Sequence, residues 1–192
     1  MKKTLIAIFT LAIVTGAAAA IWGIISFKGN AVKERAELFI SKRSDYTALL
    51  DSVKPRIKHH FAFDLYAERL NLKETFKAGH YIVEDGMNVI DIVRMFKLGL
   101  QSPLNITFNN ARDQYLLAQK LAPQIEPDSA AIVAAFDDAE LLARLGVSSA
   151  KELFGMIIPN TYEVYWTMTP KQFITRMVKE HARFWNADRR AR

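Results

Sequence analysis

The longest apolar stretch of the sequence lies at its N-terminus. From Thr4 to Phe27 no residue is charged, and Lys2 and Lys3 precede this stretch. As a helix it extends for about 36 Å, which exceeds the hydrocarbon core of a bilayer at about 30 Å. The pattern predicts a transmembrane helix over residues 4–27, with residues 1–3 as a cytoplasmic tail and the remaining chain outside.

A cleaved signal peptide is the alternative interpretation of this stretch. Small residues at 15–20 (TGAAAA) follow a first apolar run, as they do before signal-peptidase sites. The apolar run then resumes at Ile21 and Trp22 instead of ending. The sequence favours an uncleaved anchor, and both interpretations export residues 28–192.

The pattern after the apolar stretch predicts a small unit of short strands and helices. Residues 28–37 are polar and are interpreted as a stalk. Ser44 or Asp45 is expected to cap the first helix, and Asn88 and Gly99 are expected to begin and end the last one. Alternation and helical spacing predict a strand at 38–40, a helix at 44–53, a helix at 59–70, a strand at 78–83 and a helix at 88–98. In the helix at 59–70 the expected buried positions are Phe61, Leu65, Tyr66 and Leu70.

A second unit is predicted after a boundary near Gln101-Ser102-Pro103. It begins with an alternating strand, PLNITF, and ends with an amphipathic helix that Thr169-Pro170 opens. Between them the pattern predicts helices at 111–121, 129–136 and 137–145, and a helical turn from about 149 to 153. The mixture of separate strands and helices indicates an α+β fold.

Composition excludes several kinds of site. The 192 residues contain no cysteine, which excludes disulfides, thiolate zinc sites, iron–sulfur clusters and a cysteine nucleophile. The net charge is +6, with acidic residues interspersed among the basic ones. Because nucleic-acid-binding proteins usually gather their basic residues into a stripe, we expect no nucleic-acid partner. The cluster at Arg189, Arg190 and Arg192 is interpreted as a solvated chain end.

Candidate chemistry is concentrated between Phe154 and Trp166. The four histidines lack the spacing of a metal site, so we expect no metal and no cofactor. The segment from Phe154 to Trp166 combines aromatic residues with Pro159-Asn160-Thr161 and Glu163. Aromatic faces with amide and carboxylate groups are typical of sugar-binding clefts, but a buried strand and turn has the same composition.

Five segments resemble, in the same order, motifs of the endolytic murein transglycosylases, the MltG or YceG-like family, in a Bacteroidetes-like form. They are FKAGHYI at 76–82, GMNV at 86–89, KLG at 97–99, LNITF at 104–108 and FGMIIPNTY at 154–162. The last is similar to the family segment G-x-x-x-P-x-T-Y. The resemblance covers nearly the whole chain.

The resemblance implies an anchored enzyme of the cell inner membrane. Residues 38–101 are similar to a LysM module, a βααβ fold that binds glycans, and residues 102–192 to the helical first part of the catalytic domain. The family cleaves the β-1,4 bond between N-acetylmuramic acid and N-acetylglucosamine in nascent peptidoglycan and leaves 1,6-anhydro ends. Glycan strands are the implied partner, the membrane holds the single-pass anchor, and cell-wall synthases are further candidates. Residues 28–192 are expected in the periplasm.

The resemblance also assigns the site residues. The general acid of the family is a Glu in an A-S-I-[IV]-E-x-E-T segment, which is expected after Arg192 because residues 1–192 do not contain it. We expect Asn160, Thr161, Tyr162 and Glu163 to bind substrate, with Glu163 only a weak candidate for the acid, and we expect residues 1–192 alone to be inactive. A non-catalytic anchored glycan-binding or scaffold protein is the alternative, and an anchored domain with a protein partner is a third interpretation.

Overall fold

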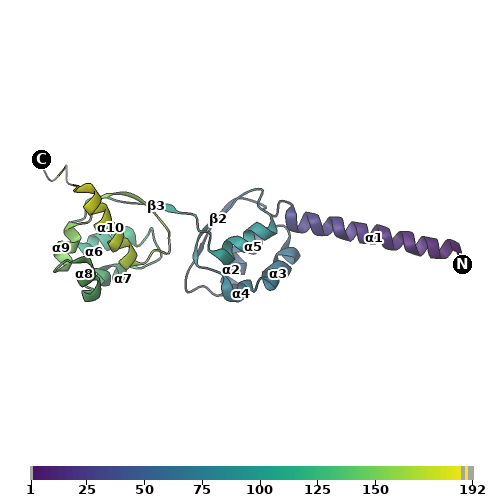
Figure 1. Cartoon of the computed structure of the whole chain (residues 1–192), viewed down its shortest axis with the longest axis horizontal. Coiled ribbons are helices and arrows are strands. Elements are labelled where there is room, and N and C mark those ends of the chain that lie inside the picture. The colour runs from purple at the N-terminus through teal and green to yellow at the C-terminus, as the bar shows by residue number, and fades with distance from the viewer. Residues whose placement is uncertain (1, 187–188, 190–192) are drawn as a thin grey trace. The chain divides into compact units, whose positions relative to one another are not determined.

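The computed structural model describes residues 2–186 and 189, and it contains two compact units. The first comprises Met1–Gln101 and the second Ser102–Arg192. Figure 1 shows both units and labels helices α1 to α10 and strands β2 and β3. Each unit has its own core of buried apolar side chains, and the elements mix helices with two-stranded sheets, so the fold is α+β.

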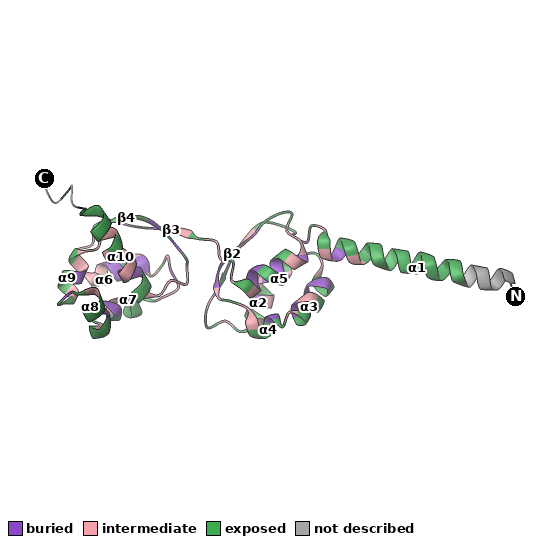
Figure 2. Ribbon diagram, in the orientation of Figure 1, coloured by how far each residue is buried: buried purple, intermediate pink, exposed green. Residues whose placement is uncertain are grey.

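The N-terminal apolar stretch forms the long helix α1 (Lys2–Lys28). Of the helices in the described part of the chain, this one is long and apolar enough over Phe9–Lys28 to cross a membrane. Its side chains from Phe9 onward are mostly exposed, as the green ribbon in Figure 2 shows. A row of exposed apolar side chains of this length is unusual for a helix in water, and a signal sequence shares the same property.

The first unit surrounds a two-stranded antiparallel sheet with helices. Strand β1 (Ala36–Ile40) pairs with β2 (Gly79–Val83), and Leu38 lies opposite Tyr81. Between and after the strands lie α2 (Tyr46–Val53), a short 3₁₀ helix η1 (Lys54–Arg56), α3 (His60–Arg69), α4 (Leu72–Thr75) and α5 (Val89–Leu98). The predicted order of strand, two helices, strand and helix is therefore observed, with η1 and α4 as short additions.

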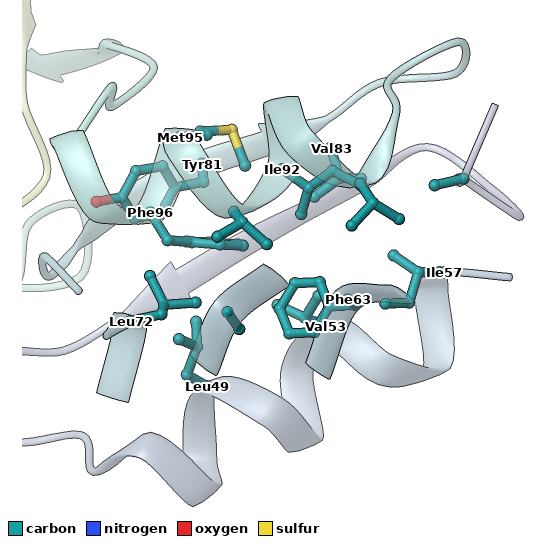
Figure 3. Packing of buried hydrophobic residues seen from close by; sticks show 14 of the residues in the cluster. Leu49, Val53, Ile57, Phe63, Leu72, Tyr81, Val83, Ile92, Met95 and Phe96 are labelled. Carbon is teal, nitrogen blue, oxygen red and sulfur yellow. The ribbon is translucent and has the colours of Figure 1, made fainter. Parts of the chain in front are cut away.

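Side chains from both strands and from the α-helices of this unit meet in one core. Figure 3 shows Tyr81, Ile92 and Phe96 facing Leu49 and Phe63. These five side chains are completely buried. The ring of Tyr81 meets that of Phe96 edge-on, with centroids 4.9 Å apart. Burial of rings and branched side chains is the main stabilising contribution in so small a unit.

Local sequence signals set the start of α2 and both ends of α5. The side chain of Asp45 accepts a hydrogen bond from the Ala48 N–H at 2.8 Å, and that of Asn88 accepts one from the Asp91 N–H at 3.0 Å. Gly99 ends α5 with a φ of 71°, a conformation that only glycine adopts without strain. The predicted caps Asp45, Asn88 and Gly99 are confirmed.

Residues 28–37 do not form the predicted stalk. Ala31 and Val32 are completely buried in the core of the first unit. The Ala31 N–H donates to the Met87 carbonyl at 2.8 Å, and Val32 forms an isolated antiparallel bridge with Ile57. The prediction failed because two small apolar residues between polar neighbours give no periodic signal. Helix α1 therefore leads directly into the first unit.

Helix α3 forms close to the predicted position but buries a different face. Its buried residues are Ala62, Phe63 and Ala67, whereas Phe61 is 65% exposed and Leu65 is 48% exposed. The two alanines let α3 pack closely against α5. The predicted burial of Phe61 and Leu65 is therefore wrong. The prediction failed because a pattern based on large apolar residues overlooks a face made of alanines.

The second unit packs helices around another antiparallel pair of strands. Strand β3 (Leu104–Phe108) pairs with β4 (Asn160–Val164). The helices are α6 (Gln114–Leu121), α7 (Ser129–Phe136), α8 (Ala139–Leu145), α9 (Ala150–Gly155) and α10 (Pro170–Phe184). Asp128, Asp138 and Ser149 cap three of them, and Thr169 with Gln172 forms a capping box at the start of α10. The positions of these helices follow the predicted pattern, apart from a later start of α6.

Candidate functional site

The antiparallel pairing of β3 and β4 brings two of the family-like segments together. Thr107 lies opposite Thr161 and Ile106 lies opposite Tyr162, although each pair is separated by more than fifty residues of chain. Successive side chains alternate between the two faces of the pair. Ile106 and Tyr162 point into the core, whereas Thr107 and Thr161 are exposed to solvent.

An open hollow of about 520 Å³ lies at the end of this strand pair. One wall comes from the end of β3 and the residues that follow it, and the other from Pro159 and the first two residues of β4. The lining residues are Thr107, Phe108, Asn109, Asn110, Pro159, Asn160 and Thr161. Hydroxyl and amide groups therefore converge beside Pro159, while the ring of Phe108 is turned into the core and is only 3% exposed. Polar groups that converge in an open hollow are typical of binding sites.

Hydrogen bonds hold the polar side of the hollow in place. The hydroxyls of Thr107 and Thr161 are 2.8 Å apart, and either can donate to the other. The side-chain oxygen of Asn160 accepts from the Thr161 N–H at 2.8 Å. Each group keeps a further donor or acceptor position, because a hydroxyl and an amide make more than one hydrogen bond. The arrangement is suited to a neutral ligand that has several hydroxyl groups.

Gln124 supports the same strand from its other edge. The Thr107 N–H donates to Gln124 Oε1 at 2.9 Å, and Gln124 Nε2 donates to the Thr107 carbonyl at 3.0 Å. Gln124 Nε2 also donates to the Lys120 carbonyl at 2.8 Å, which ties the side chain to the end of α6. The amide thus pairs with the strand as a further strand would, and it leaves the Thr107 hydroxyl directed towards Thr161.

Tyr162 supports the site from below and does not line the hollow. Its side chain is 7% exposed, and its ring stacks on Phe108 with centroids 5.7 Å apart. The hydroxyl donates to the Ile158 carbonyl at 2.7 Å, just before the turn at Pro159. Burial raises the pKa of Tyr162 above its usual 10.0, and the nearby negative charge of Glu180 adds to the rise while Arg176 opposes it. Tyr162 therefore positions the turn.

Glu163 lies on the solvent-exposed face of β4, outside the hollow. It is paired across the strands with Asn105, and its backbone carbonyl accepts a hydrogen bond from the guanidinium of Arg176. Its side chain is exposed to water. Burial is a common means by which an enzyme keeps a carboxylic acid protonated near neutral pH, and this position lacks it. The placement gives no support to Glu163 as the general acid.

The residues that line the hollow supply neutral hydrogen-bonding groups. Among the described residues, those that line it carry no carboxylate or imidazole that could transfer a proton. Within residues 2–186 and 189, no group of three or more histidine and acidic side chains is placed to hold a metal ion. The site can orient hydroxyl groups of a ligand, while proton transfer requires a group from elsewhere.

The structure adds residues that the sequence pattern did not single out. Thr107, Asn109 and Asn110 line the hollow beside the predicted Asn160 and Thr161, and Gln124 holds Thr107. An informative signal was present, because two consecutive amides follow the strand at 104–108. It could be used only once the pairing of that strand with 160–164 was known.

A comparison with known protein families identifies the family of this chain. The sequence profile of the YceG-like family matches residues 38–192, which is most of the chain. Among solved structures, a yceG-like protein, lmo1499, from Listeria monocytogenes matches with 20% identity and a TM-score of 0.35. The match covers 78% of this chain and 55% of that one, so the chain spans about half the length of this relative. No curated protein matches. Because the TM-score is low, the sequence profile carries the assignment.

Proposed function

Because the chain belongs to the YceG-like family, we propose that it is part of a membrane-anchored endolytic transglycosylase of peptidoglycan. The proposed substrate is the nascent glycan strand, and the proposed product is a strand with a 1,6-anhydro-N-acetylmuramic acid end. The observation that carries the proposal is the hollow in which Asn160 and Thr161 of one motif meet Thr107 of another and Asn109, which directly follows that motif. Its neutral hydrogen-bonding groups suit the hydroxyl and acetamido groups of a glycan.

In the proposed reaction these residues bind and orient the glycan. A carboxylic acid protonates the oxygen of the glycosidic bond, and the resulting carboxylate then accepts the proton of the 6-hydroxyl as that hydroxyl attacks C1. The ring closes without water. By the family resemblance this acid is a Glu in a motif that residues 1–192 do not contain. Asn160 and Thr161 would hold the strand so that the bond meets the acid.

The proposed location follows from α1. We propose that this helix is a single-pass anchor in the cell inner membrane, with its N-terminus in the cytoplasm and residues 28–192 in the periplasm. The length and apolar character of Phe9–Lys28 support the anchor, and the lysines at the N-terminus support the orientation. The first unit, with its strand–helix–helix–strand order, is proposed to be a LysM-like glycan-binding module. Cell-wall synthases are proposed protein partners.

Two assays test the proposal, one for binding and one for reaction. For binding, purified glycan strands are titrated against the chain and three variants. We expect Thr161→Val and Asn160→Ala to weaken binding about fivefold each, because one hydrogen bond contributes about 1 kcal/mol. Thr175→Val is the matched control, since its hydroxyl donates to the Lys171 carbonyl of its own helix at 2.7 Å and Thr175 does not line the hollow. Equal affinities for all variants would contradict a contribution of the hollow to glycan binding, and the binding would then belong to the first unit.

For the reaction, membranes of cells that express the complete gene are incubated with nascent glycan strands. Release of 1,6-anhydro ends supports the transglycosylase, and the appearance of reducing ends alone contradicts it. Glu163→Gln is expected to retain activity, and its inactivity together with normal glycan binding would identify Glu163 as the acid. Glycan binding without any cleavage by the complete gene product would favour the second candidate, an anchored glycan-binding or scaffold protein. That candidate is supported by the hollow, whose described lining residues include no acid.

A further inference from the structure

An exposed apolar surface lies beside the C-terminal end of α1. It is formed by Trp22 on α1 and by Phe61 and Leu65 on α3, which are 56%, 65% and 48% exposed. The three side chains belong to two helices of the first unit, and we call them the α1–α3 surface. Isolated exposed apolar residues are common, but a cluster of large ones indicates a contact with another apolar phase.

Two ring contacts show how α3 lies against α1. The ring of Trp22 is 6.1 Å from that of Phe61, and the ring of Phe27 is 6.4 Å from that of Tyr66. On α1 Phe27 lies five residues after Trp22, and on α3 Tyr66 lies five residues after Phe61. The first turns of α3 therefore run beside the last turns of α1, and the N-terminal end of α3 points back along α1 towards its apolar part.

The junction between α1 and the first unit is short and held by backbone hydrogen bonds. The Gly29 N–H donates to the Ile25 carbonyl at 3.0 Å, and the Lys58 N–H donates to the Ala31 carbonyl at 2.7 Å. Ser26 is almost completely buried between α1 and the unit. Because no free linker separates α1 from the first unit, a membrane that holds α1 also fixes how far α3 lies from the bilayer.

The level of Phe61 in that membrane follows from helix geometry. Trp22 lies six residues before Lys28, which corresponds to about 9 Å along the helix. The headgroup layer on each side of a bilayer is about 5–8 Å thick. If the span ends at Lys28, Trp22 and its neighbour Phe61 lie at or just below the headgroups, where aromatic side chains are enriched.

We infer that the α1–α3 surface inserts into the outer-leaflet interface of the membrane that holds α1. The occupant is lipid because the surface is continuous with the apolar side of α1 through the contact between Trp22 and Phe61. Lys28 at the end of α1 and Lys58 two residues before α3 are both exposed, so their charges are free to meet lipid phosphates. The first unit thus rests directly on the bilayer and is not held above it. This inference depends on the proposed anchoring by α1.

The absence of cysteine allows a direct test with single labels. The whole chain is reconstituted in lipid vesicles with a fluorophore at Phe61→Cys or Leu65→Cys, and quenching is measured with nitroxides on lipid headgroups and with a water-soluble quencher. Leu98→Cys is the matched control, because Leu98 is 63% exposed at the far end of α5. The first residue of α5 follows shortly after Met87, whose carbonyl accepts a hydrogen bond from the Ala31 N–H just after α1. Leu98, at the last residue of α5, is therefore at the end that lies away from α1.

The labels at 61 and 65 are expected to be quenched several-fold more strongly by the lipid nitroxide than the label at 98, and less strongly by the aqueous quencher. The same quenching at 61, 65 and 98 would overturn the inference. Protection of 61 and 65 from both quenchers would also overturn it, since protein would then cover the surface. A label at Ala17→Cys separates the two proposals: if it is not quenched by nitroxides placed deep in the acyl chains, the anchor itself is wrong.

Discussion

Replacing Tyr162 with Phe tests how the second unit holds the turn at Pro159. The change removes one hydroxyl and keeps the ring that stacks on Phe108. The lost hydrogen bond to the Ile158 carbonyl is 2.7 Å long, and Ile158 is only half-buried, so water can reach the carbonyl in the variant. The free energy of unfolding should therefore fall by about 1 kcal/mol, which changes the unfolding equilibrium about fivefold.

Tryptophan fluorescence during urea unfolding can isolate this effect. The chain has three tryptophans, and Trp166 and Trp185 lie in the second unit. In a Trp22→Phe background the whole chain in detergent reports that unit alone. Tyr81→Phe is the matched control, since its hydroxyl donates to the Lys77 carbonyl at 2.8 Å in the first unit and should leave the tryptophan transition unchanged.

Two results of the unfolding measurement would refute the expected contribution of the Tyr162 hydroxyl. An unchanged midpoint for Tyr162→Phe would mean that the hydrogen bond does not stabilise the folded unit. A loss above about 3 kcal/mol would mean that the hydroxyl supports a fully buried polar group, in conflict with the half-buried carbonyl. Glycan affinity should stay within about twofold of that of the parent chain. The Tyr162 hydroxyl does not line the hollow, and its hydrogen bond to the Ile158 carbonyl makes no contact with a bound glycan.

Two further predictions concern the first unit. Burial raises the pKa of Tyr81 from 10.0 to about 12, so the folded state retains this proton after the unfolded state has lost it. The stability that this proton contributes is complete below pH 10 and is lost as the pH rises to about 12. In urea unfolding followed by circular dichroism, the difference in unfolding free energy between the parent chain and Tyr81→Phe should therefore shrink over this range. A difference that stays constant would contradict the prediction. Gly99→Ala should destabilise the unit by about 1–2 kcal/mol, since Gly99 has a φ of 71° and an added Cβ would lie 3.0 Å from Lys77 Cγ. Gly155→Ala is the control, with nothing within 4 Å of the added atom, and thermal unfolding that shows equal losses for both would refute the role of the backbone conformation.

The signals that predicted helix ends correctly are local. Asp45 and Asn88 accept hydrogen bonds from backbone groups three residues away, and Gly99 adopts its positive φ within its own turn. Such interactions depend on neighbours in the sequence, so they could be predicted without the fold. The family also followed from the sequence, because ordered motifs such as FKAGHYI and FGMIIPNTY need no structure to be compared.

The failures concern packing between distant segments. Ala62 and Ala67 are buried because they allow α3 to approach α5, and Ala31 and Val32 are buried because the chain between α1 and β1 folds back onto the unit. Small residues carry too weak a hydrophobic signal to reveal this. Phe61, on which the membrane inference depends, is exposed because α3 buries the face that carries Ala62 and Ala67.

The sequence by itself determined the apolar helix, the helix caps, the α+β class and the family. Only the tertiary structure decided which residues form the candidate site. Thr107 and Thr161 become neighbours because β3 and β4 pair in one register, and a shift of either strand by a single residue would turn its own threonine towards the core. Register depends on the burial of Ile106 and Tyr162 against the helices, which is a property of the whole unit and not of either strand.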